Sequence, residues 1–238
     1  MTGVTHEQVT RVRDLAAERA RRVPLQHLTG VAPFRHLDLA VGPGVFIPRP
    51  ETELLVSWGL AAVAGTREPL VVDLCSGSGA IALSVAHEHP GARVVAVERL
   101  PGALLWLRRN AASSPGLEIV DGDAASPEIL SDLDGRVDLV LCNPPYVPSA
   151  SPVAPEVADH DPAAAVFAGP DGLAVIPGIV ARAAALLRPG GAVAIEHDDS
   201  HGEAVPALLR RTGAFDAVED HRDLTGRPRF ATGYRVRS

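Results

Sequence analysis

Cysteine is scarce in this chain, and its scarcity excludes two kinds of site. The 238 residues include two cysteines, Cys75 and Cys142. Two cysteines are too few for a disulfide framework, and no histidine pair has convincing metal-ligand spacing, so we predict no bound metal. Each cysteine falls at the end of an expected strand, so we interpret both as free, buried thiols.

Long apolar runs and a surplus of positive charge are also missing. No run approaches the roughly 20 apolar residues of a membrane-spanning helix, and residues 1–22 are charged, unlike a signal peptide. The net charge is −7 and every basic residue is arginine. Because tight nucleic-acid binding rests on clustered cations, this charge disfavours a nucleic-acid partner. We therefore expect a soluble, cytoplasmic protein that does not bind membranes.

Apolar residues are abundant enough for a packed core, at 46% of the chain against 21% charged residues. A chain of this length suits one large domain with a small appendage. Residues 6–22 have the apolar spacing of a helix. Residues 33–41 and 45–47 predict a β-hairpin around a Gly-Pro-Gly turn. We assign residues 1–47 to this appendage and residues 48–238 to the main domain.

From residue 70 onward, expected strands and helices alternate. The expected strands span residues 70–74, 93–97, 117–120, 137–142, 192–196, 215–219 and 230–236. The expected helices span residues 51–64, 80–87, 101–111, 127–133, 172–187 and 202–212, and residues 149–170 are expected to be a long loop. This alternation predicts an α/β protein with a mostly parallel sheet and helices on both faces.

A glycine-rich loop follows the first of these strands. After Asp73 and Leu74 come, in order, Cys75, Ser76, Gly77, Ser78 and Gly79. Glycines allow a ligand to approach the backbone closely, and the next helix presents free N–H groups to an anion or a nucleotide. Glu98 ends the next strand, where an acid can accept the hydroxyls of a ribose. NAD is a competing ligand, although the full G-x-G-x-x-G pattern is absent because Ala82 holds the last position.

A second motif ends the strand at residues 137–142. It consists of Asn143, Pro144, Pro145 and Tyr146. The two prolines stiffen the backbone and supply no N–H. The carbonyls of Asn143 and Pro144 and the flat face of Tyr146 suit a planar –NH2 group. The motif therefore predicts a site for an amide or an amino-purine, although Asn-Pro also begins ordinary turns.

Three strings together resemble the protein-glutamine N5-methyltransferases of the HemK/PrmC type, which modify peptide chain release factors. These strings are residues 48–53 (Pro-Arg-Pro-Glu-Thr-Glu), residues 73–80 and residues 143–146. The resemblance implies a class I methyltransferase fold that is Rossmann-like, with a mostly parallel seven-stranded sheet and an antiparallel last strand. It also implies S-adenosylmethionine as the cofactor in place of NAD, with residues 48–53 against its site. The implied partner is a protein, first of all a release factor, and we expect a monomeric enzyme.

The resemblance also implies roles for single residues. It places Cys75, Ser76, Gly77, Ser78 and Gly79 along the methionine part of the cofactor, with Asp73 in the same cofactor-binding set. It places Glu98 at the ribose, Asp123 and Ala124 beside the adenine, and Asn143 where the acceptor meets the sulfonium. Substrate binding falls to Asn143, Pro144, Pro145 and Tyr146, of which Asn143, Pro144 and Tyr146 are the expected catalytic residues.

Two departures from this family stand out. About one helix precedes the hairpin, where family members have several that help to grip the protein substrate. Residues 197–201 also replace an expected glycine and a later glutamine after Glu196. Two alternatives stay open: an N6-adenine methyltransferase acting on DNA or RNA, because the same motif serves that nitrogen, and a non-catalytic module that binds the cofactor.

Overall fold

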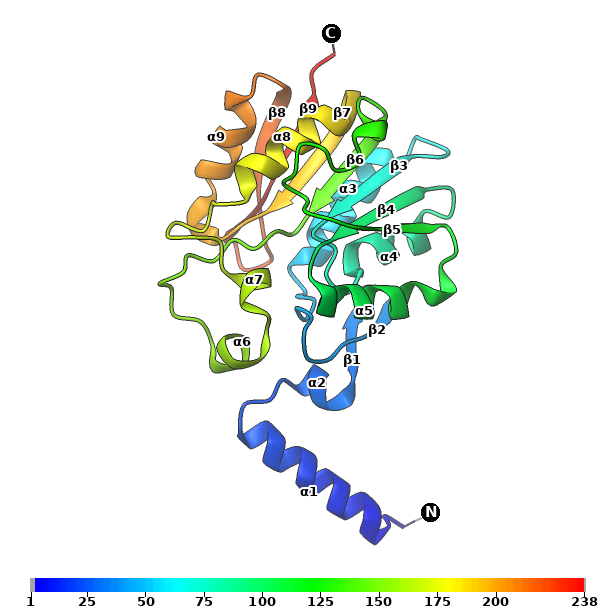
Figure 1. The fold of residues 1–238 in the computed structure, drawn as a ribbon, viewed down its shortest axis with the longest axis vertical. Helices are drawn as coiled ribbons and strands as arrows, with labels where there is room; N and C mark the ends of the chain where they lie inside the picture. The colour runs from blue at the N-terminus through cyan, green and yellow to red at the C-terminus, as the bar shows by residue number, and fades with distance from the viewer. Residues whose placement is uncertain (1–2, 238) are drawn as a thin grey trace.

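A computed structural model describes residues 3–237, and a seven-stranded sheet forms its centre (Figure 1). The strand order is β5-β4-β3-β6-β7-β9-β8. The strands are β3 (Leu70–Leu74), β4 (Arg93–Glu98), β5 (Leu117–Asp121), β6 (Val137–Cys142), β7 (Leu187–Glu196), β8 (Phe215–Arg222) and β9 (Pro228–Arg235). Pairs from β5 through β7 are parallel, whereas β9 is antiparallel to both of its neighbours. The expected mostly parallel sheet with an antiparallel last strand is confirmed.

Helices cover both faces of this sheet. One face packs against α3 (Thr52–Val63), α4 (Ala80–Glu88) and α5 (Pro101–Asn110), and the other packs against α8 (Ile176–Leu186) and α9 (Ala204–Arg211). Successive strand residues point to opposite faces, so in β3 Val71 joins the first core and Val72 joins the second. Because both faces are buried, the strands are continuous apolar runs, which is why the sequence predicted them well.

The N-terminal hairpin lies elsewhere than expected. Its strands are β1 (Val31–Phe34) and β2 (Leu37–Ala40), and residues 45–47 form no strand. The expected pairing of residues 33–41 with residues 45–47 is therefore wrong. The turn falls at Arg35, which has a left-handed φ of 51°. Its backbone N–H donates to Glu53 and its guanidinium pairs with Glu88, so long-range contacts fix this turn.

The segments that flank the hairpin contain further short elements. Helix α1 (His6–Ala20) begins with a capping box between Thr5 and Gln8, and none of its residues is buried. Helix α2 (Leu25–Thr29) follows it. The hairpin itself packs on the sheet domain, because Phe34 lies in the same core cluster as the helices of the first face. The domain boundary at residue 47 stays a prediction.

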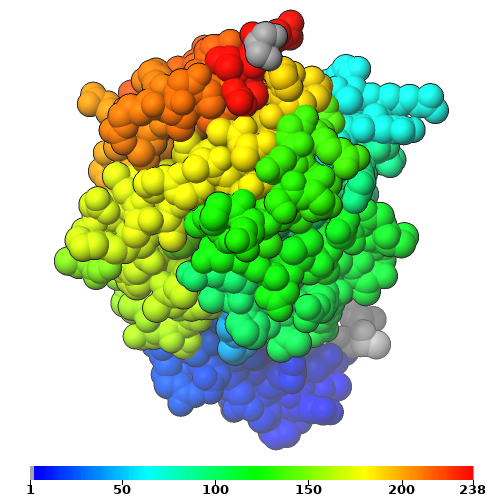
Figure 2. All heavy atoms as spheres, turned by 45° about the horizontal axis from the view of Figure 1, so that its top comes forward, coloured from blue at the N-terminus to red at the C-terminus, as the bar shows by residue number. Residues whose placement is uncertain are grey.

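The expected long loop at residues 149–170 is wrong in part, because it contains two short helices, α6 (Pro155–His160) and α7 (Ala163–Val166). Ion pairs join α6 to the C-terminal end of α1, because Glu156 pairs with Arg19 and with Arg22, just beyond the helix. In the space-filling view the yellow-green surface of this segment adjoins the blue N-terminal region (Figure 2). The expected helix at residues 127–133 shrinks to a single 3₁₀ turn, η2 (Ser131–Leu133), and two more such turns are η1 (Ala111–Ser113) and η3 (Asp199–His201). Within residues 3–237, no helix has the length and apolar character to cross a bilayer.

Candidate active site

A cavity of about 340 Å³ opens at the carboxyl ends of β3, β4 and β6. In open α/β sheets, ligands bind at this edge, where the strand order reverses, and here the order reverses between β3 and β6. The sequence-predicted residues that line the cavity are Cys75, Ser76, Gly77, Ser78, Glu98, Asp123, Ala124, Asn143, Pro144, Pro145 and Tyr146. The fold thus gathers three distant strings around one cavity.

Asp73 and Gly79, also predicted for the site, lie beneath the loop and not on the cavity wall. Asp73 is fully buried, and its Oδ2 accepts a hydrogen bond of 3.1 Å from the backbone N–H of Ala82. Its Oδ1 has no hydrogen-bond partner within residues 3–237. Burial raises the pKa of Asp73 to about 7. Gly79 has φ 89°, and an added Cβ would lie 2.7 Å from Leu107, so this glycine permits close packing of α5.

The glycine loop presents its backbone to the cavity. Cys75 and Gly77 have left-handed φ values of 65° and 58°, which strain a cysteine but suit a glycine. A Cβ added to Gly77 would have no described atom within 4 Å, so the space above this residue is open. The loop is tied to β4 by two backbone donors, Ser76 to the Val97 carbonyl at 2.9 Å and Gly77 to Glu98 Oε2 at 2.8 Å.

Glu98 is 6% exposed, and within residues 3–237 its carboxylate is bonded only by backbone N–H groups. Besides the bond from Gly77, its Oε1 accepts from the N–H groups of Arg99 at 2.8 Å and Leu100 at 2.7 Å. A carboxylate offers about four lone-pair positions, and three are filled here. One acceptor position, on Oε2, is left for a ligand hydroxyl.

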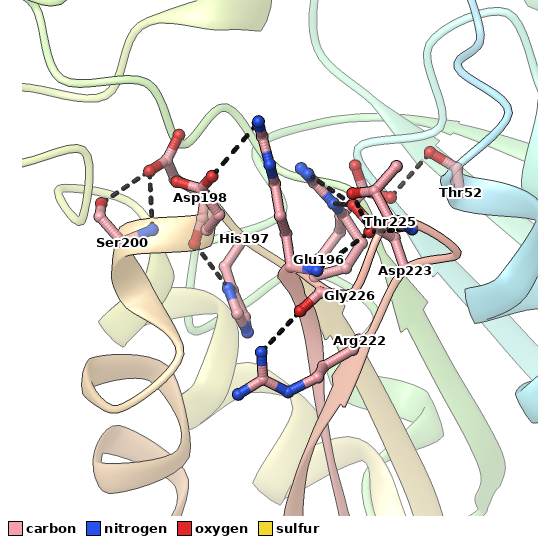
Figure 3. Close-up of polar contacts among 12 residues, drawn as sticks. Thr52, Glu196, His197, Asp198, Ser200, Arg222, Asp223, Thr225 and Gly226 are labelled. Atoms are coloured by element: carbon pink, nitrogen blue, oxygen red, sulfur yellow. Dashed lines mark hydrogen bonds and ion pairs between the residues drawn. The ribbon is translucent and has the colours of Figure 1, made fainter.

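The opposite wall is organised by side chains. Asn143 Nδ2 donates to Thr52 Oγ1 at 3.1 Å. The Thr52 hydroxyl donates to Glu196 Oε2 at 2.7 Å (Figure 3). The hydroxyl of Tyr146 donates to the other oxygen, Glu196 Oε1, at 2.9 Å. Thr52 is 3% exposed and Glu196 is 1% exposed. One buried carboxylate therefore anchors both Asn143 and Tyr146.

Burial dominates the electrostatics of this network. Burial raises the pKa of Glu196, while the bonds from Thr52 and Tyr146 and the charge of Arg229 act in the opposite direction. Burial, with the nearby Glu196 charge, raises the pKa of the Tyr146 phenol well above its usual value. Tyr146 is therefore a neutral hydrogen-bond donor here and is not suited to act as a base.

The sequence did not predict the contributions of Thr52, Glu196 and Arg49 to the site. Arg49 Nη2 pairs with the buried Asp161 Oδ2 at 2.7 Å and so ties residues 48–53 to the segment that carries α6 and α7. The sequence placed residues 48–53 near the cofactor but assigned no role to any individual side chain among them. A signal for Glu196 did exist, because an acid that ends a buried strand lies at the same sheet edge as Glu98.

In the part of the chain that the structure describes, the cysteines and His197 form no metal site. Both cysteines are free; Cys142 is buried as expected, whereas Cys75 is only partly buried, which corrects the expectation of two buried thiols. His197 is fully buried and bonds the Asp198 carbonyl at 2.8 Å and Asp220 at 3.0 Å. Within residues 3–237, no cluster of three or more His, Cys, Asp or Glu residues could hold a metal ion.

The fold defines the class of protein. The catalytic domain of hMettl16, solved in complex with the MAT2A 3'UTR hairpin 6, superposes with a TM-score of 0.65 at 16% identity. That match covers 94% of this chain and 82% of the solved chain, and at this identity it shows the fold alone. The family model of the methyltransferase small domain matches residues 50–159. The chain thus has the class I methyltransferase fold.

Similarity in sequence narrows this class. The release factor glutamine methyltransferase of Mycolicibacterium smegmatis is 53% identical, over 93% of this chain and 78% of that relative. The chain belongs to the release factor glutamine methyltransferase family, which confirms the resemblance found in the sequence. A 4-amino-L-phenylalanine/4-methylamino-L-phenylalanine methyltransferase of Streptomyces pristinaespiralis is 42% identical, over 83% of this chain and 68% of the relative.

Proposed function

We propose that this chain transfers the methyl group of S-adenosylmethionine to the side-chain amide nitrogen of a glutamine in a peptide chain release factor. The observation that carries the proposal is the hydrogen bonding of the Asn143 side-chain amide. Its Nδ2 is bonded to Thr52, while its Oδ1 accepts no hydrogen bond within residues 3–237. A free amide oxygen on the cavity wall suits an acceptor that brings N–H donors. The relatives named release factor glutamine methyltransferases support glutamine as that acceptor.

The wall formed by the glycine loop and Glu98 fits S-adenosylmethionine. The open space above Gly77 would admit the methionine part beside the loop. The remaining acceptor position on Glu98 would take one ribose hydroxyl, and Asp123 and Ala124 would flank the adenine. Acidic groups near the cavity also suit the positive charge of a sulfonium. When bound, this cofactor supplies an electrophilic methyl group.

The wall formed by Asn143, Pro144 and Tyr146, here called the acceptor wall, would then orient a poor nucleophile. An amide nitrogen attacks weakly because its lone pair is delocalised. Asn143 Oδ1 and the Pro144 carbonyl would accept its two hydrogens and turn the lone pair toward the methyl group, with the Tyr146 ring against the amide plane. Such positioning lowers a barrier by up to roughly 7–11 kcal/mol in well-oriented systems. The same oxygens would stabilise positive charge that develops on the nitrogen.

A small aromatic amine is a second candidate acceptor. The Streptomyces pristinaespiralis relative is named for methylation of 4-amino-L-phenylalanine and its methylamino product. An aryl –NH2 group carries two hydrogens in a plane, as an amide –NH2 does, so it would satisfy the same two oxygens. The two acceptors differ in size, and the cavity geometry alone favours neither.

A panel of acceptors tests the proposal. The purified chain would be incubated with methyl-labelled S-adenosylmethionine and, separately, with a release factor, a version whose Gly-Gly-Gln glutamine is replaced by alanine, 4-amino-L-phenylalanine, and adenine-containing DNA and RNA. We expect label in the intact release factor alone. Label in the aromatic amine would favour the second candidate, and label in nucleic acid would favour an adenine methyltransferase. Cofactor binding with no label in any acceptor would refute glutamine methylation of release factors.

A further inference from the structure

Two buried side chains support Asn143 and Tyr146 and have no part in the mechanism above; Thr52 lines the cavity, whereas Glu196 does not. Thr52 is the first residue of α3, and Glu196 is the last residue of β7. They are hydrogen-bonded to each other although 144 residues separate them (Figure 3). Buried polar groups of this kind are costly unless their bonds are satisfied, so their arrangement invites a functional explanation.

The direction of each hydrogen bond follows from the chemistry of the partners. The Thr52 hydroxyl has a single hydrogen, and it donates this hydrogen to Glu196 Oε2 at 2.7 Å. The Thr52 oxygen can then only accept from Asn143, and it does so from Nδ2 at 3.1 Å. If the Asn143 amide turned over, its Oδ1 would face a Thr52 oxygen that has no hydrogen left to give. The chain of bonds therefore keeps Asn143 Oδ1 away from Thr52.

The same carboxylate also fixes the second acceptor-site side chain. Glu196 Oε1 accepts from the Tyr146 hydroxyl at 2.9 Å, which holds one edge of the ring. Arg229 supplies positive charge near this group and is itself paired with Asp223 at 3.1 Å. Both oxygens of Glu196 are thus hydrogen-bonded, Oε2 to Thr52, which holds Asn143, and Oε1 to Tyr146.

We propose that Thr52 and Glu196 are positioning residues that set the hydrogen-bond polarity of the acceptor site. The carboxylate orders the Thr52 hydroxyl, which turns the Asn143 amide so that its oxygen meets the incoming –NH2, and it holds the Tyr146 ring alongside. This inference rests on the proposed function in one respect, that the acceptor presents an –NH2 group. It extends that function by naming the residues that make the site select a methyl acceptor whose nitrogen donates hydrogen bonds. A group that can only accept hydrogen bonds would find no donor in Asn143 Oδ1.

Substitution of Thr52 separates positioning from simple packing. Thr52→Val keeps the shape and removes the hydroxyl, whereas Thr52→Ser keeps the hydroxyl. We expect Thr52→Val to lower kcat on the release factor by about 10- to 100-fold with the cofactor Kd unchanged, because the amide is then free to turn. Thr52→Ser should restore most of the turnover. A kcat for Thr52→Val within about twofold of the unaltered chain would overturn the proposal.

Thr232→Val is the matched control. Thr232 is 2% exposed, its hydroxyl bonds His221 at 2.8 Å, and it does not line the cavity. Both valine variants lose a buried threonine hydroxyl, so both should lower the melting temperature, but only Thr52→Val should lower kcat. Equal loss of kcat in the two variants would mean that Thr52 acts through stability alone, which contradicts a positioning role.

A second readout does not depend on activity. The side-chain amide signals of Asn143 can be identified in a nitrogen–proton NMR spectrum by their loss in Asn143→Asp. In the unaltered chain we expect slow hydrogen exchange at this –NH2 group, and in Thr52→Val we expect faster exchange. The same slow exchange in both would overturn the proposal. If the unaltered chain methylates no acceptor, the proposed function fails, yet this measurement still decides the orientation of Asn143.

Discussion

The two walls of the cavity are built in different ways. On the wall proposed to hold the cofactor, here called the cofactor wall, backbone N–H groups bond the Glu98 carboxylate from one residue away for Arg99, two for Leu100 and 21 for Gly77. On the wall proposed to hold the acceptor, side chains bond side chains across 91, 144 and 50 residues. The first wall is a loop shape that a short string encodes. The second exists only after the sheet and α3 have come together, so its chemistry is open to change by single side chains.

The largest effect should come from Asn143→Ala. This change removes the oxygen that would accept from the acceptor –NH2 but leaves the glycine loop untouched. We expect transfer to fall by about 10²- to 10³-fold, the usual cost of removing one such group, with the cofactor Kd nearly unchanged. Calorimetry and mass spectrometry on the same sample measure the two quantities. Equal losses of binding and transfer would show that the walls are not separable.

The next effect concerns stability on the cofactor side. The pKa of Asp73 rises from 3.8 to about 7 on folding because of burial, so the folded state holds a proton that the unfolded state releases. A raised carboxyl pKa therefore costs stability as pH rises from 3.8 to 7, and the cost is complete above 7. From pH 5 to pH 8, the unfolding free energy of the unaltered chain should fall by roughly 2–3 kcal/mol through this group. The Asp73→Asn variant should not show this fall, so its stability relative to the unaltered chain should rise by the same amount.

Urea unfolding of both chains at the two pH values measures this difference. Asn keeps an oxygen that can accept from Ala82, so the comparison isolates the ionisation. Parallel pH dependence in the two chains would mean that Asp73 titrates normally and that no cost is stored beneath the loop.

A smaller effect should follow from Gly77→Val, which tests cofactor binding on the cofactor wall. A side chain there enters the open space above the loop, so we expect the cofactor Kd to rise about tenfold. Gly213→Val is the control, because Gly213 has a similar φ of 64°, open surroundings and a place away from the cavity. Both variants should lose about 1–2 kcal/mol of stability through backbone strain, whereas weaker binding should be confined to Gly77→Val. An unchanged Kd would place the methionine part elsewhere.

The smallest effect expected is that of thiol modification. Cys75 lines the cavity, whereas Cys142 is buried beneath it. Alkylation with a small reagent should therefore occur at Cys75 and weaken cofactor binding several-fold. Cys75→Ala should bind the cofactor and resist the reagent. Cofactor affinity that is unchanged after complete alkylation of Cys75 would remove this residue from the cofactor wall.

The same contrast explains what the sequence could predict. Strands β3, β4 and β6 were predicted almost to the residue because they are apolar runs buried on both faces. The hairpin was misplaced because its turn depends on contacts of Arg35 with distant acids. The short helices α6 and α7 lie in an alanine- and proline-rich stretch with no helical periodicity long enough to detect. The bond from Thr52 to Glu196 could not be foreseen, since no local pattern relates residues so far apart.

The position of the transferred methyl group tests the proposed reaction. The chain would be incubated with S-adenosylmethionine and an intact release factor, and fragments of the release factor would be sequenced by tandem mass spectrometry. We predict one added methyl group on the side-chain amide nitrogen of the Gly-Gly-Gln glutamine. A methyl group on any other residue, or two methyl groups on that nitrogen, would contradict an acceptor site built around one oriented –NH2 group.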